Sequence, residues 1–144
     1  MACFEQIIHT ADIAYRIKGA TPEKLFNCGL QAWRHAITGM DLILFSVSVE
    51  RKIDLSASDL EMLLVEFLSE INYLITVEKL FAANCDILEI SQHHENYHLT
   101  AKVNGINISE IAHLDISEIK AVTFHQLNIV EENGILWTNL VFDI

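Results

Sequence analysis

The hydrophobic pattern of the chain predicts two amphipathic helices set among strands. In the first, apolar residues recur at helical spacing between a start signal at Thr21 and Pro22 and a stop at Gly39. The same stripe returns over residues 60–75, where Ser58 and Glu61 have the spacing of a capping box. These two helices are the clearest local signals in the sequence.

Strands are predicted where apolar and polar residues alternate or β-branched residues gather. Residues 4–8 and 12–18 form the first two, and Asp12 begins the second. The later candidates are an extended segment at 41–54, a hairpin of 85–92 with 97–103 that turns at Asn96, a turn at 104–105, a strand at 119–129, and a last hairpin in which 135–144 follows the turn at 132–134. Residues 77–83 are ambiguous between helix and strand, and 106–115 carry no clear pattern.

The order of these elements predicts the fold class. Strands, helix, strand, helix and then mostly strands favour an α+β domain, in which a mixed sheet carries two helices on one face and a smaller sheet or hairpin is added. The 144 residues contain no Pro/Ser-rich linker, low-complexity tract or repeat. We therefore expect a single domain over residues 1–144.

Charge narrows the classes of partner. The chain has 20 acidic and 9 basic residues, a formal net charge of −11, and no run of Lys or Arg. This composition argues against direct binding to nucleic-acid phosphates and favours cations or a basic protein partner. No apolar stretch reaches the length of a membrane span, and the N-terminus lacks the features of a signal peptide.

The cysteines suggest a reducing compartment. Cys3, Cys28 and Cys85 are odd in number and widely spaced, and no CxxC or Cys/His zinc pattern occurs. We expect three reduced thiols and a cytoplasmic location.

Two carboxylates near the chain ends are the candidate metal ligands. If the fold brings the ends together, Asp12, Asp143 and the terminal carboxylate of Ile144 converge on one point. Three carboxylates share a site only with a cation or with protons taken up, and hard oxygen ligands suit Ca²⁺, Mg²⁺ or Mn²⁺. The alternative is that Asp12 is a solvated turn residue and Asp143 a solvated chain end.

The histidines give no metal-binding motif. His94 and His98 are four residues apart, but that spacing aligns side chains only on a helix, and this segment reads as a hairpin. His93 and His94 point to opposite faces of a strand. No nucleophile, phosphate-loop or metalloprotease motif occurs either, so the sequence does not indicate an enzyme.

Taken together, five segments of the chain resemble the archease family along nearly its whole length. They are His9-Thr10-Ala11-Asp12-Ile13, the Gly19-x-Thr21 step into a helix with Leu25-Phe26, Leu63-Leu64-x-x-Phe67-Leu68, Lys120-Ala121-Val122-Thr123-Phe124-His125, and Val141-Phe142-Asp143-Ile144. The departures are small: Phe124 stands where the family commonly has tyrosine, and residues 84–115 match poorly.

This resemblance implies an α+β fold with a larger sheet carrying two helices and a minor sheet. It implies an accessory factor of tRNA splicing that promotes guanylylation and multiple turnover of the tRNA-splicing RNA ligase without being an enzyme itself. It carries a divalent-metal site onto Asp12, Asp143 and Ile144 and a functional lysine onto Lys120. Apart from the resemblance, the residues His9 and Thr10 near Asp12 are possible support for the site. Two other classes remain open: a chaperone-like protein-binding module and a stand-alone metal-dependent hydrolase.

Overall fold

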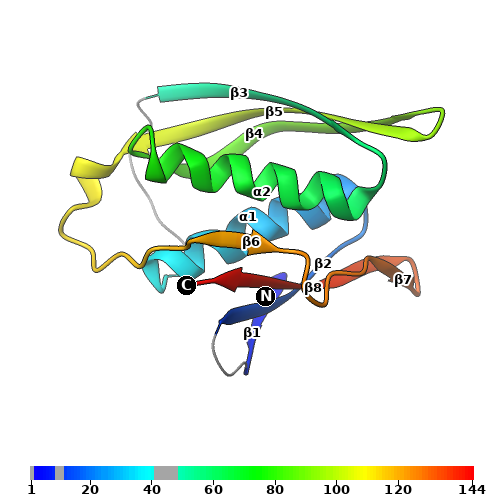
Figure 1. The fold of residues 1–144 in the computed structure, drawn as a ribbon, viewed down its shortest axis with the longest axis horizontal. Helices are drawn as coiled ribbons and strands as arrows, with labels where there is room; N and C mark the ends of the chain where they lie inside the picture. The colour runs from blue at the N-terminus through cyan, green and yellow to red at the C-terminus, as the bar shows by residue number, and fades with distance from the viewer. Residues whose placement is uncertain (1, 9–11, 41–48) are drawn as a thin grey trace.

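The protein has three layers, with helices between two sheets. The structure, a computed structural model, describes residues 2–8, 12–40 and 49–144. Within these residues, two α-helices contact a larger sheet on one side and a smaller sheet on the other (Figure 1). The α+β class with a larger and a smaller sheet is confirmed.

The described elements follow the order strand, strand, helix, strand, helix and then strands. Their bounds are β1 (Phe4–Ile7), β2 (Ile13–Gly19), α1 (Pro22–Thr38), β3 (Val49–Ala57), α2 (Leu60–Thr76), β4 (Leu80–His93), β5 (Asn96–Asn107), the 3-10 helix η1 (Ile108–Ile111), β6 (Ala121–Thr123), β7 (Val130–Glu132) and β8 (Ile135–Asp143). Neither α1 nor α2 is long and apolar enough to cross a membrane.

The larger sheet places β2, near the start of the chain, beside β8, the last strand. Its strands run in the order β1-β2-β8-β6, and β7 also pairs with β8. The smaller sheet has the order β3-β5-β4. Every pairing between described strands is antiparallel, so the expected mixed sheet is antiparallel in this part of the chain. The crossover through α1 leads from β2 into the other sheet, where no parallel neighbour of β2 is formed.

Helix α1 packs closely because it contains a glycine. A β-carbon at Gly29 would lie 3.3 Å from Leu68 Cδ1 of α2 and 3.5 Å from Ile17 Cδ1 of β2. Glycine in a helix costs about 1 kcal/mol relative to alanine, and this close approach to both neighbours explains its use. Nearby, the fully buried rings of Trp33 and Phe81 stack and join α1 to the smaller sheet.

The start of α1 agrees with the sequence, whereas that of α2 differs by one residue. Thr21 Oγ1 accepts from Lys24 N at 3.2 Å, and Gly39 ends α1 with a left-handed φ of 73°. The Ser58 capping box is wrong: strand β3 runs to Ala57, and Asp59 caps α2 by accepting from Met62 N at 2.7 Å. Glu61 accepts instead from the backbone N–H of Ile129 at 3.1 Å.

Residues 104–105, predicted as a turn, lie inside β5. Gly105 pairs with Val49 on one side and Ala82 on the other, so it belongs to the central strand of the smaller sheet. Its missing side chain fits this position, because a β-carbon there would lie 3.4 Å from Leu80 Cβ. The other turn, which was predicted at Asn96, connects β4 to β5. It falls before Asn96, because Asn96 already pairs with His93.

The strand predicted at 119–129 is short. Only Ala121–Thr123 pairs with β8, and Gln126 then takes a left-handed φ of 61° that turns the chain. The hairpin predicted around residues 132–134 is confirmed. Asn133 and Gly134 both have positive φ, 54° and 78°, as a tight hairpin turn requires. Residues 41–48, predicted as part of an extended segment, lie outside the described residues.

Cys3 and Cys28 form a disulfide, with their α-carbons 5.9 Å apart. The prediction of three reduced thiols is therefore wrong for this pair. Sequence spacing hides the contact, because it forms only when the start of β1 is brought against α1 by the larger sheet. Cys85, on β4, is outside the disulfide.

Candidate metal site at the end of the larger sheet

The register of β2 against β8 brings Asp12 to Asp143. Ile13, the first residue of β2, pairs with Phe142 in an antiparallel ladder. Asp12 directly precedes Ile13, and Asp143 directly follows Phe142 as the last residue of β8. The two aspartates are therefore the residues next to the last pair of this ladder. That their carboxylates share one ion stays a prediction.

Strand β6 covers the other side of this end of β8. Ala121 pairs with Asp143, and the backbone N–H of Lys120 donates to Asp143 O at 2.7 Å. We call the four residues expected from the sequence, Asp12, Asp143, Ile144 and Lys120, the tip. Each lies at or directly next to a paired end of β2, β8 or β6.

The tip is partly exposed to solvent, and the strand residue next to it is buried. Phe142 is fully buried next to Asp143, whereas both aspartates are half-buried and Ile144 is 45% exposed. A site of this kind lets a hydrated cation enter while the strand behind it stays fixed. Lys120 is exposed and directly precedes Ala121, the residue that pairs with Asp143.

The donor set fits a hard divalent cation. Two side-chain carboxylates and a terminal carboxylate offer oxygen ligands, the type that Ca²⁺, Mg²⁺ and Mn²⁺ prefer. Among the described residues, no three His, Cys, Asp or Glu side chains form a group that could hold a metal. The terminal carboxylate of Ile144 stays a predicted third donor, as the sequence suggested. His9 and Thr10 lie outside the described residues, and their supporting roles stay predictions.

A buried hydrogen-bond relay supports the tip from behind. Trp33 Nε1 of α1 donates to Asn72 Oδ1 of α2 at 3.0 Å, and Asn72 Nδ2 donates to Ile119 O at 2.8 Å. Ile119 immediately precedes Lys120, so the relay fixes the point where β6 begins. Sequence reasoning missed Asn72, although a polar residue beside the apolar stripe of α2 was a usable signal.

His98 belongs to the smaller sheet, whereas the tip belongs to the larger sheet. His98 Nδ1 lies 2.9 Å from Ser56 Oγ, and its Nε2 lies 3.2 Å from Asp54 Oδ1. Residue types alone would suggest a Ser-His-Asp triad. However, the three are cross-strand neighbours on the open face of a sheet, and the Asp54 side chain is 72% exposed. We interpret them as a solvated polar pairing of β3 with β5.

His125 is not part of strand β6. It lies in the turn after β6, and its backbone N–H donates to Thr123 Oγ1 at 3.2 Å. His93 and His94 are exposed at the β4–β5 turn, where His94 has a φ of 57°.

Comparison with known proteins gives one consistent family. Residues 4–144 match the Archease protein family (MTH1598/TM1083). The protein archease of Methanosarcina mazei is 33% identical over 141 residues, covering 98% of this chain and 95% of that protein. The protein archease of Methanothermobacter thermautotrophicus is 28% identical, with full coverage of both chains.

Two solved structures share the fold. The solution structure of Methanobacterium thermoautotrophicum protein 1598 superposes with a TM-score of 0.82 at 27% identity and covers both chains completely. The crystal structure of an archease from Thermotoga maritima, described as a possible chaperone, gives a TM-score of 0.61 at 22% identity over 97% of this chain and 96% of that one.

Proposed function

Because the chain belongs to the archease family, we propose that it is an accessory factor that promotes guanylylation and multiple turnover of the tRNA-splicing RNA ligase, acting in the cytoplasm through a divalent cation held at the tip. In this proposal the protein activates a ligase and is not itself an enzyme. The observation that supports it is the antiparallel pairing of Ile13 with Phe142, because Asp12 and Asp143 are the residues next to this pair in the chain.

Asp12, Asp143 and the terminal carboxylate of Ile144 would hold the cation. The ion would supply positive charge for the phosphate groups used in guanylylation. The protein's own residues orient that site: β6 holds the end of β8 through the Lys120 N–H, and the relay through Asn72 holds β6. The Lys120 ammonium, on the exposed side, would balance the carboxylates or contact a phosphate of the partner.

The proposal predicts that the tip acts only when its cation is bound. The acidic tip needs the cation, because a negatively charged tip alone would repel the phosphates of the ligase's nucleotide. The chain has a net charge of −11, so it has little other means of approaching a polyanion. Direct binding to RNA is accordingly not part of this function.

The test is a guanylylation assay with a tRNA-splicing RNA ligase, nucleotide and each divalent cation in turn. Asp12→Ala and Asp143→Ala should each remove most of the stimulation that the parent protein gives. Asp54→Ala is the matched control, because it removes an exposed aspartate from the other sheet. The proposal fails if both tip variants stimulate the ligase as well as the parent does.

A chaperone-like module is the second candidate, since the Thermotoga maritima relative is described as a possible chaperone. That function requires binding to unrelated unfolded chains and no dependence on the aspartate pair. An aggregation-suppression assay with unfolded client proteins separates the two. Suppression that survives Asp12→Ala and Asp143→Ala, together with no effect on a ligase, would favour the chaperone.

A further inference from the structure

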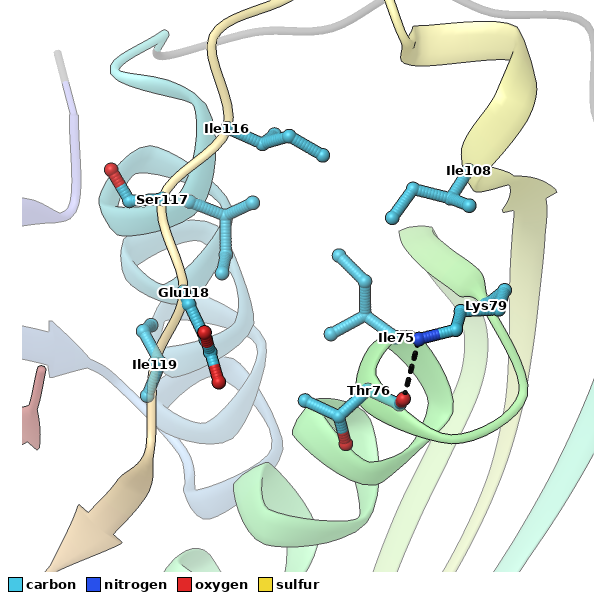
Figure 2. A pocket seen from close by; sticks show the side chains of 9 residues that line it. Ile75, Thr76, Lys79, Ile108, Ile116, Ser117, Glu118 and Ile119 are labelled. Atoms are coloured by element: carbon cyan, nitrogen blue, oxygen red, sulfur yellow. Dashed lines mark hydrogen bonds between the residues drawn. The ribbon is translucent and has the colours of Figure 1, made fainter.

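An apolar cleft lies where the C-terminal ends of α1 and α2 meet the chain between η1 and β6. Its volume is about 280 Å³. Figure 2 shows it opening between the segment that carries Ile116 to Ile119 on one side and Ile108 and Lys79 on the other. The lining residues are Ile37, Ile75, Thr76, Lys79, Ile108, Ile116, Ser117, Glu118 and Ile119.

Isoleucines make the interior of the cleft apolar. Ile37, Ile75 and Ile119 are between 1% and 7% exposed and form its buried base, while Ile108 and Ile116 are half-buried. A branched aliphatic group that entered would exchange water for these side chains, which is favourable. The volume is slightly below the usual range of ligand pockets, so it suits only a small molecule.

Two opposite charges line this apolar cleft without neutralising each other. Lys79 and Glu118 approach from opposite walls (Figure 2). The Lys79 ammonium donates to Thr76 O at 2.9 Å, which leaves it donors to spare. Within the described part of the chain, Glu118 makes no hydrogen bond or ion pair and is exposed. A ligand that carries both charges would satisfy both residues at once.

The backbone holds Lys79 in a fixed position on its wall. Its φ is 60°, a region that a lysine rarely adopts. Its carbonyl accepts from the N–H of Ile108 at 2.9 Å, which ties it to η1. On the facing wall, Ser117 N donates to Ile37 O at 2.8 Å and ties the segment before Glu118 to the end of α1. Both walls are thus anchored to helices.

We propose that this cleft binds a small aliphatic zwitterion of the class of the free branched-chain amino acids. The aliphatic side chain lies among the isoleucines, the carboxylate meets Lys79, and the ammonium meets Glu118. A simple aliphatic acid would leave Glu118 without a partner, and a simple amine would leave Lys79 without one. This assignment uses a different part of the molecule from the tip and does not depend on the proposed function.

The experiment is an NMR titration of the protein, ¹³C-labelled at isoleucine methyls, with L-leucine through the millimolar range. The methyl signals of Ile37, Ile75 and Ile116 should shift and saturate. 4-Methylvalerate, which is leucine without the ammonium, and isoamylamine, which is leucine without the carboxylate, should each bind at least about tenfold more weakly, since each loses a charge-assisted hydrogen bond.

Two variants test the charged pair. Glu118→Gln keeps the shape and removes the charge, and Lys79→Asn places at φ 60° a residue that tolerates this conformation. Each should weaken leucine at least about tenfold, whereas Glu110→Gln, an exposed residue of η1 outside the lining, should leave it unchanged. Asp143→Ala should also leave it unchanged, which keeps this test separate from that of the tip.

Three results would overturn the assignment. The first is the absence of saturable methyl shifts with leucine. The second is binding of 4-methylvalerate or isoamylamine as tightly as leucine, because the cleft would then not recognise both charges of the zwitterion. The third is unchanged leucine affinity in both Glu118→Gln and Lys79→Asn.

Discussion

The two sheets place aspartates in different physical settings. In the larger sheet, Asp143 ends a strand next to the fully buried Phe142, and its pairing with Ala121 of β6 fixes its backbone. In the smaller sheet, Asp54 lies in mid-strand on an open face and meets His98 with 72% of its side chain exposed. The first setting concentrates negative charge at a half-buried point, whereas the second lets water screen it. A strand end backed by a core is therefore the better place for a cation site.

The two sheets also differ in how they are fastened to the helices. Cys3 and Cys28 join the edge of the larger sheet to α1, and the closed loop spans a sequence separation of 25 residues. Breaking this disulfide should lower the free energy of unfolding by about 3 kcal/mol, the largest stability effect we expect. Urea unfolding of the parent protein with and without a reductant measures it. Cys3→Ser should unfold like the reduced parent, and Cys85→Ala in the smaller sheet should change stability by less than about 1 kcal/mol.

The prediction for the disulfide is contradicted if the reductant does not change the unfolding midpoint of the parent protein. In that case the attachment of β1 to α1 would depend on packing alone, and both sheets would be held in the same way.

The buried support behind the tip should rank second. Asn72→Ala leaves Trp33 Nε1 and Ile119 O without their partner in a buried place, which costs about 2–3 kcal/mol. Chemical denaturation measures the loss, and hydrogen exchange at Lys120 N–H should speed up because β6 is released. Ser69→Ala, exposed on the same helix, should change stability by less than about 0.5 kcal/mol. A loss under about 1 kcal/mol for Asn72→Ala would mean that the relay does not support the tip.

Local chemistry explains what could be predicted from the sequence. Thr21, Pro22 and Gly39 act on the helix next to them, so both the start and the end of α1 were predictable. The Asn133-Gly134 turn likewise depends on its own backbone preferences. Asp59 shows the limit: which of two adjacent polar residues caps α2 depends on where β3 ends, and that depends on pairing with β5.

Contacts between distant segments explain what could not be predicted. Gly105 reads as a turn in isolation but lies between two strands, and the Cys3–Cys28 pair forms only through the arrangement of β1 and α1. For the tip, the carboxylates near the chain ends and a family resemblance indicated the residues, whereas the register of β2 against β8 required the structure. Asn72 was missed because its partners lie on α1 and before β6.

The third-largest effect is expected when the terminal carboxylate is moved. Adding two glycines after Ile144 moves this group away from the aspartates, so calcium, magnesium or manganese affinity should fall by at least about tenfold in calorimetric titration. Two glycines inserted between His94 and Glu95, at the turn of the smaller sheet, should leave the affinity unchanged. If the extended chain binds the cation as tightly as the parent, the terminal carboxylate is not a ligand.

The smallest effect should come from the open face of the smaller sheet. His98→Ala removes the contacts with Ser56 and Asp54, yet exposed pairs of this kind are worth about 0.2–1 kcal/mol. Thermal unfolding should therefore show a small change, and ligase stimulation should be unaffected. A large loss of ligase stimulation in His98→Ala would show that the smaller sheet takes part in the function and would break the contrast between the sheets.

The central claim is that the strand register at the end of the larger sheet creates a cation site, and cation affinity measured by isothermal titration calorimetry tests it most directly. Asp12→Asn and Asp143→Asn preserve shape and remove one carboxylate each, and Asp54→Asn is the same change in the other sheet. We predict that the two tip variants bind the preferred divalent cation at least about tenfold more weakly than the parent, while Asp54→Asn binds it equally well. Equal affinity in all four proteins would contradict the account.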